Sequence, residues 1–233
     1  MDLTYGQDYA ARGLEEAAVG RLSVLGDLLL SAAFNVTSIS EPVAIEQFHF
    51  LDALALLELE EVRTASQLAD LGSGAGLPAL VLAVAAHDCR VTAVESLRKK
   101  CEFIEYAASQ MGLQNVAVKC LRAEEYGRGE GRNSHDAVVS RALASLPVVA
   151  EYSLPLLRDG GAMIAMKGEI SNQECIYAEK ALDILGAGRL ESHRLVPFAG
   201  AENRWVYVAR KVSITPDSFP RRPGVPSKRP LGT

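Results

Sequence analysis

Three glycines at alternating positions are the residues in this chain whose spacing most clearly suits a chemical task. Gly72, Gly74 and Gly76 follow a short apolar run that Asp70 interrupts, and they precede the apolar stretch 77–86. This order predicts a buried strand, a tight turn and the start of a helix. Because glycine has no Cβ, such a turn adopts positive φ and lets a ligand lie against the main chain. We expect free amide groups at the helix start to face a negatively charged ligand.

The spacing of the glycines restricts the ligand. A dinucleotide-binding turn has its third glycine where this chain has Leu77, so we expect a smaller anion, such as the carboxylate of a bound amino acid. Glu95 ends the next apolar run, and a carboxylate at that position accepts hydrogen bonds from both hydroxyls of a ribose. Together these features predict an adenosyl ligand with an amino-acid end, and a turn without a ligand is the alternative.

Alternating strands and helices must position these residues. Strands are predicted at 67–72, 90–95, 115–120, 136–141, 162–167, 190–197 and 204–210, and helices at 77–86, 97–112, 145–157 and 172–185. Connections through helices require parallel strands with right-handed crossovers, whereas the short link 198–203 requires an antiparallel hairpin. We therefore predict an α/β fold with a Rossmann-like sheet of seven strands, six parallel and one antiparallel in the C-terminal hairpin.

The residues before this sheet are predicted to be helical. Apolar residues recur at helical spacing from 9 to 34, and a second helix is predicted from 43 to about 59, after a start signal at 40–42. His49 and Asp52 are three residues apart on one face of that helix and are therefore able to touch. They form either a structural polar pair or part of a pocket roof, and we assign no proton transfer to His49.

Charge and proline are concentrated near the C-terminus. The 233-residue chain has a net charge of −5, but seven basic residues and one acidic residue follow from Arg204 on, which leaves +6 there and −11 before it. Half of the ten prolines lie in the last eighteen residues and predict an extended, semi-rigid tail. Such a tail suits a polyanionic partner, and a solvated segment without a role is the alternative. Within one structural domain we expect a helical extension (1–64), a core (65–211) and a basic tail (212–233).

Other features argue against several classes of protein. No run of eighteen apolar residues would span a membrane, and the residues after Met1 lack the basic region of a signal peptide. The four cysteines have no C-x-x-C spacing, which argues against a zinc site and a disulfide framework. We expect a cytoplasmic protein with free thiols and no metal.

Several motifs resemble one known family. They are the segments 49–54, 70–78, 95–100, 122–125, 140–146 and 166–168 and the basic, proline-rich ending 220–231. Together they resemble the class I S-adenosylmethionine-dependent methyltransferases and, within that class, the RsmG (GidB) family of bacterial 16S ribosomal RNA guanine-N7 methyltransferases. The resemblance spans almost the whole chain and is weakest before about residue 40. Glu95 stands where many members have Asp, and either carboxylate can hold a ribose.

The resemblance implies a class I methyltransferase fold and a reaction. A methyl group passes from S-adenosylmethionine to N7 of a guanosine in the 530 loop of 16S rRNA, and S-adenosylhomocysteine is the product. With the glycine turn and Glu95, the resemblance gives the candidate cofactor-binding residues Gly72, Ser73, Gly74, Gly76, Leu77, Glu95, Ala123, Glu124 and Arg141.

The implied reaction needs positioning more than proton transfer. Guanine N7 carries no proton, so we assign no catalytic base and expect in-line positioning and exclusion of water to drive the reaction. Arg141 and Lys167 follow the fourth and fifth core strands, which places them at the ligand-binding edge of the sheet. We expect Arg141 at the methionine end of the cofactor or at guanine O6, and Lys167 at a phosphate; a surface ion pair is the alternative for each. The candidate substrate-binding residues are His49, Lys167, Arg204, Arg221, Arg222, Lys228 and Arg229.

Two other functions stay open on the sequence alone. A class I methyltransferase that acts on a small molecule or a protein would have a closed pocket and no dependence on RNA. A ribosome-assembly protein would keep the cofactor fold and bind RNA without turnover. If the protein is an rRNA methyltransferase, as the resemblance implies, its partner is 16S rRNA or the small ribosomal subunit, which it binds as a monomer.

Overall fold

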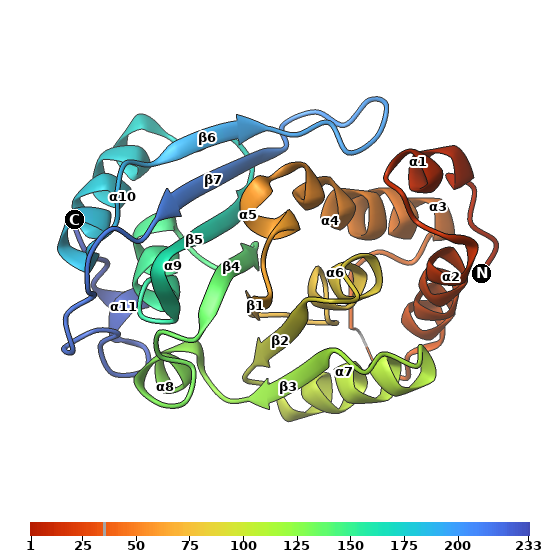
Figure 1. The fold of residues 1–233 in the computed structure, drawn as a ribbon, viewed down its shortest axis with the longest axis horizontal. Coiled ribbons are helices and arrows are strands. Elements are labelled where there is room, and N and C mark those ends of the chain that lie inside the picture. Colours follow the sequence, from red (N-terminus) through yellow and green to blue (C-terminus); the bar gives the residue numbers. More distant parts are fainter. Residues whose placement is uncertain (35) are drawn as a thin grey trace.

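The alternating segments fold into one mixed sheet with helices on both of its faces (Figure 1). The structure is a computed structural model that describes residues 1–34 and 36–233. The strand order is β3-β2-β1-β4-β5-β7-β6. The strands are β1 (Gln67–Leu71), β2 (Arg90–Glu95), β3 (Val116–Cys120), β4 (His135–Arg141), β5 (Leu157–Lys167), β6 (Glu191–Arg194) and β7 (Trp205–Arg210). The pairings among β1 to β5 are parallel and β7 is antiparallel to both neighbours, which confirms the predicted directions.

The bounds of most core elements follow the predictions from the sequence. α10 (Asn172–Leu185) matches because both of its ends carry local signals: Ser171 Oγ accepts a hydrogen bond from the Glu174 amide at 3.2 Å, and Gly186 leaves the helix at φ +83°. β6 is shorter than the predicted 190–197. All four of its residues are exposed at the edge of the sheet, and β7 is its pairing partner.

Alternate residues of the central strands supply two hydrophobic layers. On β4, Ala137 and Val139 belong to one layer and Val138 to the other, as the period of a strand requires. The N-terminal helices, α6 (Ala79–Ala85) and α7 (Arg98–Gln110) cover the first layer. α8 (Ala123–Arg128), α9 (Leu146–Ser153) and α10 cover the second. Both faces of the sheet are buried, so a ligand can reach it at the ends of the strands.

The N-terminal extension differs from the prediction of one helix over 9–34. It forms α1 (Gly6–Ala11) and α2 (Glu16–Ser31), because Gly13 adopts φ +76° and the Leu14 amide donates back to the Tyr9 carbonyl, which closes α1. The next helix begins at Pro42 as predicted. It continues as α3 (Pro42–Ile45), the π-helical η1 (Glu46–Leu51), α4 (Asp52–Leu54) and the 3₁₀-helical η2 (Ala55–Glu58), and α5 (Glu60–Arg63) follows. No helix in the described part of the chain is long and apolar enough to cross a membrane.

The C-terminal segment 212–233 folds back onto the body of the protein (Figure 1). The prediction of an extended tail is wrong here, because the segment contains α11 (Val225–Lys228), which packs against α9. Pro226 fits because it lies in the first helical turn, where its missing N–H is not needed. Arg132 also holds the segment, donating to the carbonyls of Phe219 and Thr215 at 2.8 Å each.

Candidate functional site

The carboxyl ends of the parallel strands meet at one edge of the sheet and carry Glu95, Arg141 and Lys167. Two neighbouring cavities open at this edge. The first cavity, of about 320 Å³, includes Gly72, Glu95 and Arg141 in its lining, and the second, of about 480 Å³, includes Arg141 and Lys167. A larger cavity of about 780 Å³ lies around Arg63 and His87 and contains none of the candidate residues. The chemistry-bearing residues therefore point to the two smaller cavities.

The glycine turn has the backbone that its sequence predicts. Gly72, Gly74 and Gly76 all have positive φ, between +59° and +78°. A Cβ on Gly72 would come within 2.6 Å of Leu143 Cδ1, and Leu143 lines the first cavity. The turn thus needs glycine at position 72 both for its φ and for the approach of Leu143.

Most amide groups of this turn are not free, which corrects the expectation that they face a ligand. Gly72 and Ser73 donate to the Val94 carbonyl, and Gly76 and Leu77 donate to the Ser73 carbonyl. Gly74 donates to Glu95 Oε2 at 2.9 Å. Of the candidate residues in the turn, Gly72 lines the first cavity; the other four, Ser73, Gly74, Gly76 and Leu77, lie behind it and are not among the lining residues.

Glu95 joins the turn to the next helix and faces the first cavity. Its Oε2 accepts the Gly74 amide, and its Oε1 accepts the Leu97 amide at 2.8 Å. A carboxylate has about four acceptor positions, so each oxygen keeps one lone pair for a ligand hydroxyl. The backbone bonds therefore orient Glu95 without using up its capacity to hold a ribose.

Asp70 is a functional candidate that the sequence reasoning did not single out. It is 1% exposed, and its Oδ2 accepts the Ala79 amide at 3.1 Å, while Oδ1 has no hydrogen-bond partner in the described part of the chain. Burial raises the pKa of Asp70 to about 6. In the sequence, Asp70 is recognisable as the acid that interrupts the apolar run before Gly72. A buried acceptor without a donor requires explanation, and a ligand or a water at this position would supply one.

Arg141 stands between the two cavities and lines both. Its Nη1 donates to the Phe48 carbonyl at 2.8 Å and lies 3.8 Å from Asp52 Oδ2. Burial lowers its pKa, and the carboxylates of Asp52 and Asp70 oppose that shift. Ala142, the next residue, also lines both cavities and has φ +51°, a conformation that L residues rarely adopt outside special sites. The end of β4 therefore places the charged side chain of Arg141 where the two cavities meet.

The second cavity combines an acid, two arginines and aromatic rings. Asp52 lies 3.1 Å from the Arg204 Nε, and the Arg204 guanidinium also lies over the Phe48 ring at 5.4 Å from its centroid. Burial raises the pKa of Asp52, while Arg141 and Arg204 counteract the shift. Trp205 lines the same cavity. The cavity thus presents both ring faces and charged hydrogen-bonding groups.

His49 and Asp52 lie in the same wall, and in the part of the chain that the structure describes they have different hydrogen-bond partners. His49 Nε2 is bonded to Thr37 Oγ1 at 2.8 Å, and its Nδ1 lies 3.4 Å from Arg141 Nη2. Burial and the charge of Arg141 lower the pKa of His49 to about 4. The wide π-helical turn of η1 directs the Phe48 carbonyl to Arg141. His49 is therefore a neutral residue that shapes this wall.

The remaining candidate residues differ in their accessibility. Lys167 Nζ donates to the Glu174 carboxylate at 2.8 Å and to the Ala144 carbonyl at 2.9 Å. This ion pair corresponds to the alternative to a phosphate contact. Arg221 pairs with Glu151 inside the protein, and a role for it in RNA binding stays a prediction. The other candidate residues of the segment, Arg222, Lys228 and Arg229, are exposed. Ala123 and Glu124 line the first cavity, and their contact with a cofactor stays a prediction.

Comparisons with known proteins agree with this geometry. The family described as rRNA small subunit methyltransferase G matches residues 27–199. The chain is 38% identical over 216 residues to a ribosomal RNA small subunit methyltransferase G of Desulfitobacterium hafniense, covering 91% of this chain and 89% of that protein. It is 40% identical over 224 residues to the protein of that name from Rubrobacter xylanophilus, covering 93% and 86%. The fold is similar to that of a SAM-dependent O-methyltransferase from Thermotoga maritima, with a TM-score of 0.55, 20% identity, and coverage of 82% and 72%.

Proposed function

We propose, from the premise that this chain belongs to the rRNA small subunit methyltransferase G family, that it methylates N7 of a guanosine in the 530 loop of 16S rRNA. The observation that carries the proposal is the pair of neighbouring cavities that share Arg141 and Ala142. A methyl donor in the first cavity and a base in the second would meet at these two residues. The family relationship supports S-adenosylmethionine as the donor.

The residues of the first cavity fit this cofactor, which supplies a methyl group on a positively charged sulfur. Glu95 keeps acceptor positions for both ribose hydroxyls. Arg141, in the lining, suits the carboxylate. Asp70 is not among the lining residues, and its unpaired oxygen would reach the ammonium group through a water. Ala123 and Glu124 would lie beside the adenine. Every charged end of the cofactor thus has a counterpart.

The second cavity suits a guanine that has left its stack. Trp205 and Phe48 line it with aromatic rings, and Arg141 and Arg204 offer donors to the acceptor O6, which leaves the N7 lone pair free to attack the methyl group. Asp52 holds both arginines in place through its carboxylate. N7 attacks through an in-plane lone pair, so the residues need only align the base and exclude water.

The protonation states support a mechanism without a general base. His49 lines the second cavity and is neutral above about pH 4; its Nε2 is bonded to Thr37, and its Nδ1 lies 3.1 Å from the Phe48 carbonyl and 3.4 Å from Arg141 Nη2. No proton leaves N7 during the transfer, and the product S-adenosylhomocysteine carries no charge on sulfur. The rate enhancement then comes from proximity, orientation and the electrostatic environment of the junction.

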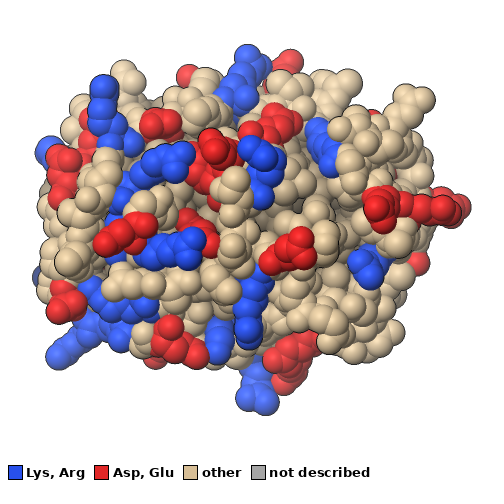
Figure 2. Space-filling view, in the orientation of Figure 1, with Lys and Arg blue, Asp and Glu red and all other residues tan. Residues whose placement is uncertain are grey.

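The exposed cations of the C-terminal segment support an RNA partner. Arg222, Lys228 and Arg229 are exposed, and Figure 2 shows basic side chains gathered at the lower left of this face, where α8 and α11 lie in Figure 1. Phosphate contacts of this kind position an RNA without reading its sequence. The protein acts as a monomer in the cytoplasm, where its ribosomal substrate is assembled.

A labelled methyl transfer assay tests the function. The protein is incubated with methyl-labelled S-adenosylmethionine and either small-subunit RNA or assembled small subunits, and the labelled nucleotide is located on the RNA. Label on one guanine of the 530 loop is the expected result. Label on a small molecule or on protein would indicate a different methyltransferase, and RNA binding without label would indicate an assembly protein.

A further inference from the structure

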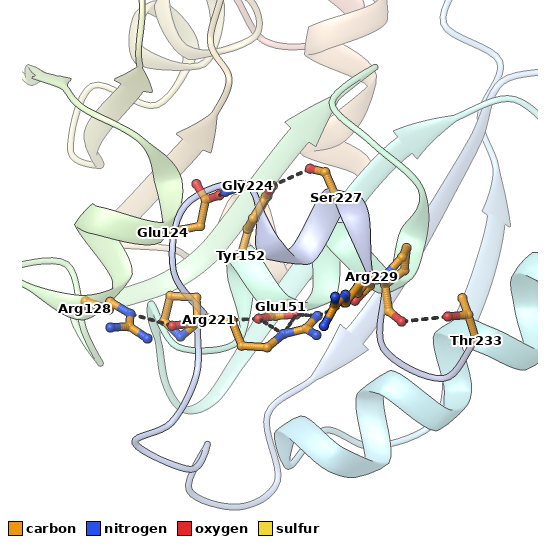
Figure 3. Close-up of polar contacts among 11 residues, drawn as sticks. Glu124, Arg128, Glu151, Tyr152, Arg221, Gly224, Ser227, Arg229 and Thr233 are labelled. Atoms are coloured by element: carbon orange, nitrogen blue, oxygen red, sulfur yellow. Dashed lines mark hydrogen bonds and ion pairs between the residues drawn. The ribbon is translucent and has the colours of Figure 1, made fainter.

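Residues far away in the sequence hold the C-terminal segment against the body of the protein by hydrogen bonds and packing. Arg128 Nε donates to the Pro220 carbonyl at 2.6 Å, and a Cβ on Gly127 would lie 3.2 Å from the Pro220 ring. Figure 3 shows this segment running past Glu124, Glu151 and Tyr152. The segment therefore has a defined path over α8 and α9 without RNA present.

The strongest of these contacts is the ion pair between Arg221 and Glu151. Glu151 comes from α9 and its side chain is 0% exposed. Its carboxylate accepts the Arg221 amide at 2.8 Å and Arg221 Nε at 2.9 Å, and Arg221 Nη2 completes a bidentate pair. The same Nη2 donates to the Arg229 carbonyl at 2.8 Å. One guanidinium thus satisfies a buried charge and fixes the loop that contains α11.

This ion pair places other parts of the segment against the first cavity. The Gly224 amide donates to Glu124 Oε1 at 2.9 Å, and Ser227 Oγ is bonded to the Tyr152 hydroxyl at 3.0 Å (Figure 3). Glu124, Tyr152 and Ser227 all line the first cavity together with Glu95. Ser227 is the lining residue that comes from the C-terminal segment. One wall of the cavity is therefore built from this segment.

We propose that the C-terminal segment is part of the cofactor site, with Ser227 as a wall residue and Arg221 as the positioning residue that holds that wall. This proposal rests on the proposed function, because it assumes that the first cavity takes S-adenosylmethionine. The segment then has two roles on two sides. Its inner side closes the cavity, and its outer side presents Arg222, Lys228 and Arg229 to RNA.

Binding of S-adenosylhomocysteine to the protein without RNA, measured by calorimetry, tests the proposal. Arg221→Gln removes the ion pair, and Arg222→Gln removes an equal charge from the exposed neighbouring residue. We expect Arg221→Gln to weaken the affinity about tenfold, because the wall is no longer preorganised. Arg222→Gln should change it by less than about twofold, as expected for an exposed charge. Arg221→Lys should restore part of the affinity.

A second pair of variants separates a pocket wall from a purely structural role. Ser227→Phe leaves the Arg221–Glu151 pair intact and places a ring at the first cavity, whereas Thr233→Phe adds the same ring at the end of the segment. Ser227→Phe should weaken binding about tenfold or more, since the ring takes space that the ligand needs. Its melting temperature should fall only by the few degrees that the lost hydrogen bond to Tyr152 explains. Thr233→Phe should bind normally. This pair also decides the question if Arg221→Gln does not fold.

The outcomes show whether the proposed function fails or only the inference about the C-terminal segment. If the unmodified protein takes up no S-adenosylhomocysteine, the proposed function and the inference fail together. If it binds the ligand, and Arg221→Gln and Ser227→Phe bind it equally well, the segment is not part of the site and the proposed function stands.

Discussion

At the scale of single residues, the proposed site centres on Arg141. This arginine contacts the main chain of η1 through the Phe48 carbonyl, faces Asp52, and lines both cavities. Its pKa is lowered by burial, yet an arginine stays charged throughout the physiological range. A permanent cation at the junction can hold the cofactor carboxylate and also contact the guanine.

Arg141→Ala should therefore impair both binding and turnover. We expect cofactor affinity to fall by about tenfold or more, as for the loss of a charge-assisted hydrogen bond, with a further loss in turnover. Calorimetry with S-adenosylhomocysteine and single-turnover methylation measure the two effects separately. Arg90→Ala, which removes an exposed arginine from the start of β2, is the control. Unchanged affinity and turnover in Arg141→Ala would remove Arg141 from the site.

His49 allows a prediction about acid stability. Its pKa is lowered from 6.5 to about 4 in the folded protein by burial and by Arg141, so the unfolded chain binds a proton in that interval that the folded protein does not. The free energy of unfolding should therefore fall as the pH drops from 6.5 toward 4, by about 1–3 kcal/mol from this residue.

Denaturant unfolding at pH 7 and pH 5 measures this loss. His49→Gln should lose less stability between the two values than the unmodified protein. His135, whose pKa burial also lowers to about 4, keeps its own share in both proteins. An equal loss in both proteins would mean that His49 is protonated normally in the fold. Above pH 6.5 the histidine stays neutral, and the rate of methyl transfer should not show its titration.

At the scale of elements, the strand–turn–helix unit from β1 to α6 forms the floor of the site. Its glycines have positive φ, and most of its amides are bonded within the chain, so the unit has its shape without a ligand. Glu95 connects it to the start of α7 through the amides of Gly74 and Leu97. The unit therefore contributes shape and a fixed carboxylate rather than free amide donors.

Gly72→Ala tests this floor against a control with the same backbone strain. Gly112 has φ +66°, close to the +69° of Gly72, but no atom lies within 4 Å of a Cβ placed there. Gly112→Ala should cost about 1–2 kcal/mol of stability from strain alone. Gly72→Ala should cost more and should also weaken S-adenosylhomocysteine binding, because Leu143 must move into the first cavity. Thermal unfolding and calorimetry compare the two, and equal effects would contradict this role for Gly72.

At the scale of the whole molecule, charge is arranged so that an acidic body carries a basic C-terminal segment. The net charge is −5, while the exposed side chains of Arg222, Lys228 and Arg229 share one short stretch around α11. These cations lie on the same segment that borders the first cavity. RNA bound to them would therefore lie next to the cofactor.

The salt dependence of RNA binding tests this arrangement. Each phosphate contact contributes roughly 0.7 to 0.9 to the slope of log affinity against log salt, so Arg222→Gln with Arg229→Gln should lower the slope by about 1.5. The control pair is Arg63→Gln with Arg90→Gln. These exposed residues lie near the opposite edge of the sheet, where β1 and β2 begin, and their loss should leave the slope unchanged. Equal slopes in all three proteins would show that the segment does not contact the RNA backbone.

Local patterns in the sequence were enough to predict the number and direction of the strands, the glycine turn and the carboxylate at the end of β2. These features follow from hydrophobic periodicity, loop length and the conformational freedom of glycine, which act over a few neighbouring residues. The bounds of β2 and α10 match for this reason.

Only the tertiary structure decided which polar groups are available to ligands. The Gly224 amide meets Glu124 across 100 positions in the chain, and Arg221 meets Glu151 across 70. Composition favoured an extended basic tail, but a buried carboxylate on α9 needs a cation, and the fold brings Arg221 to it. Local pattern sets the backbone, whereas the partner of a buried charge depends on which distant element the fold places beside it.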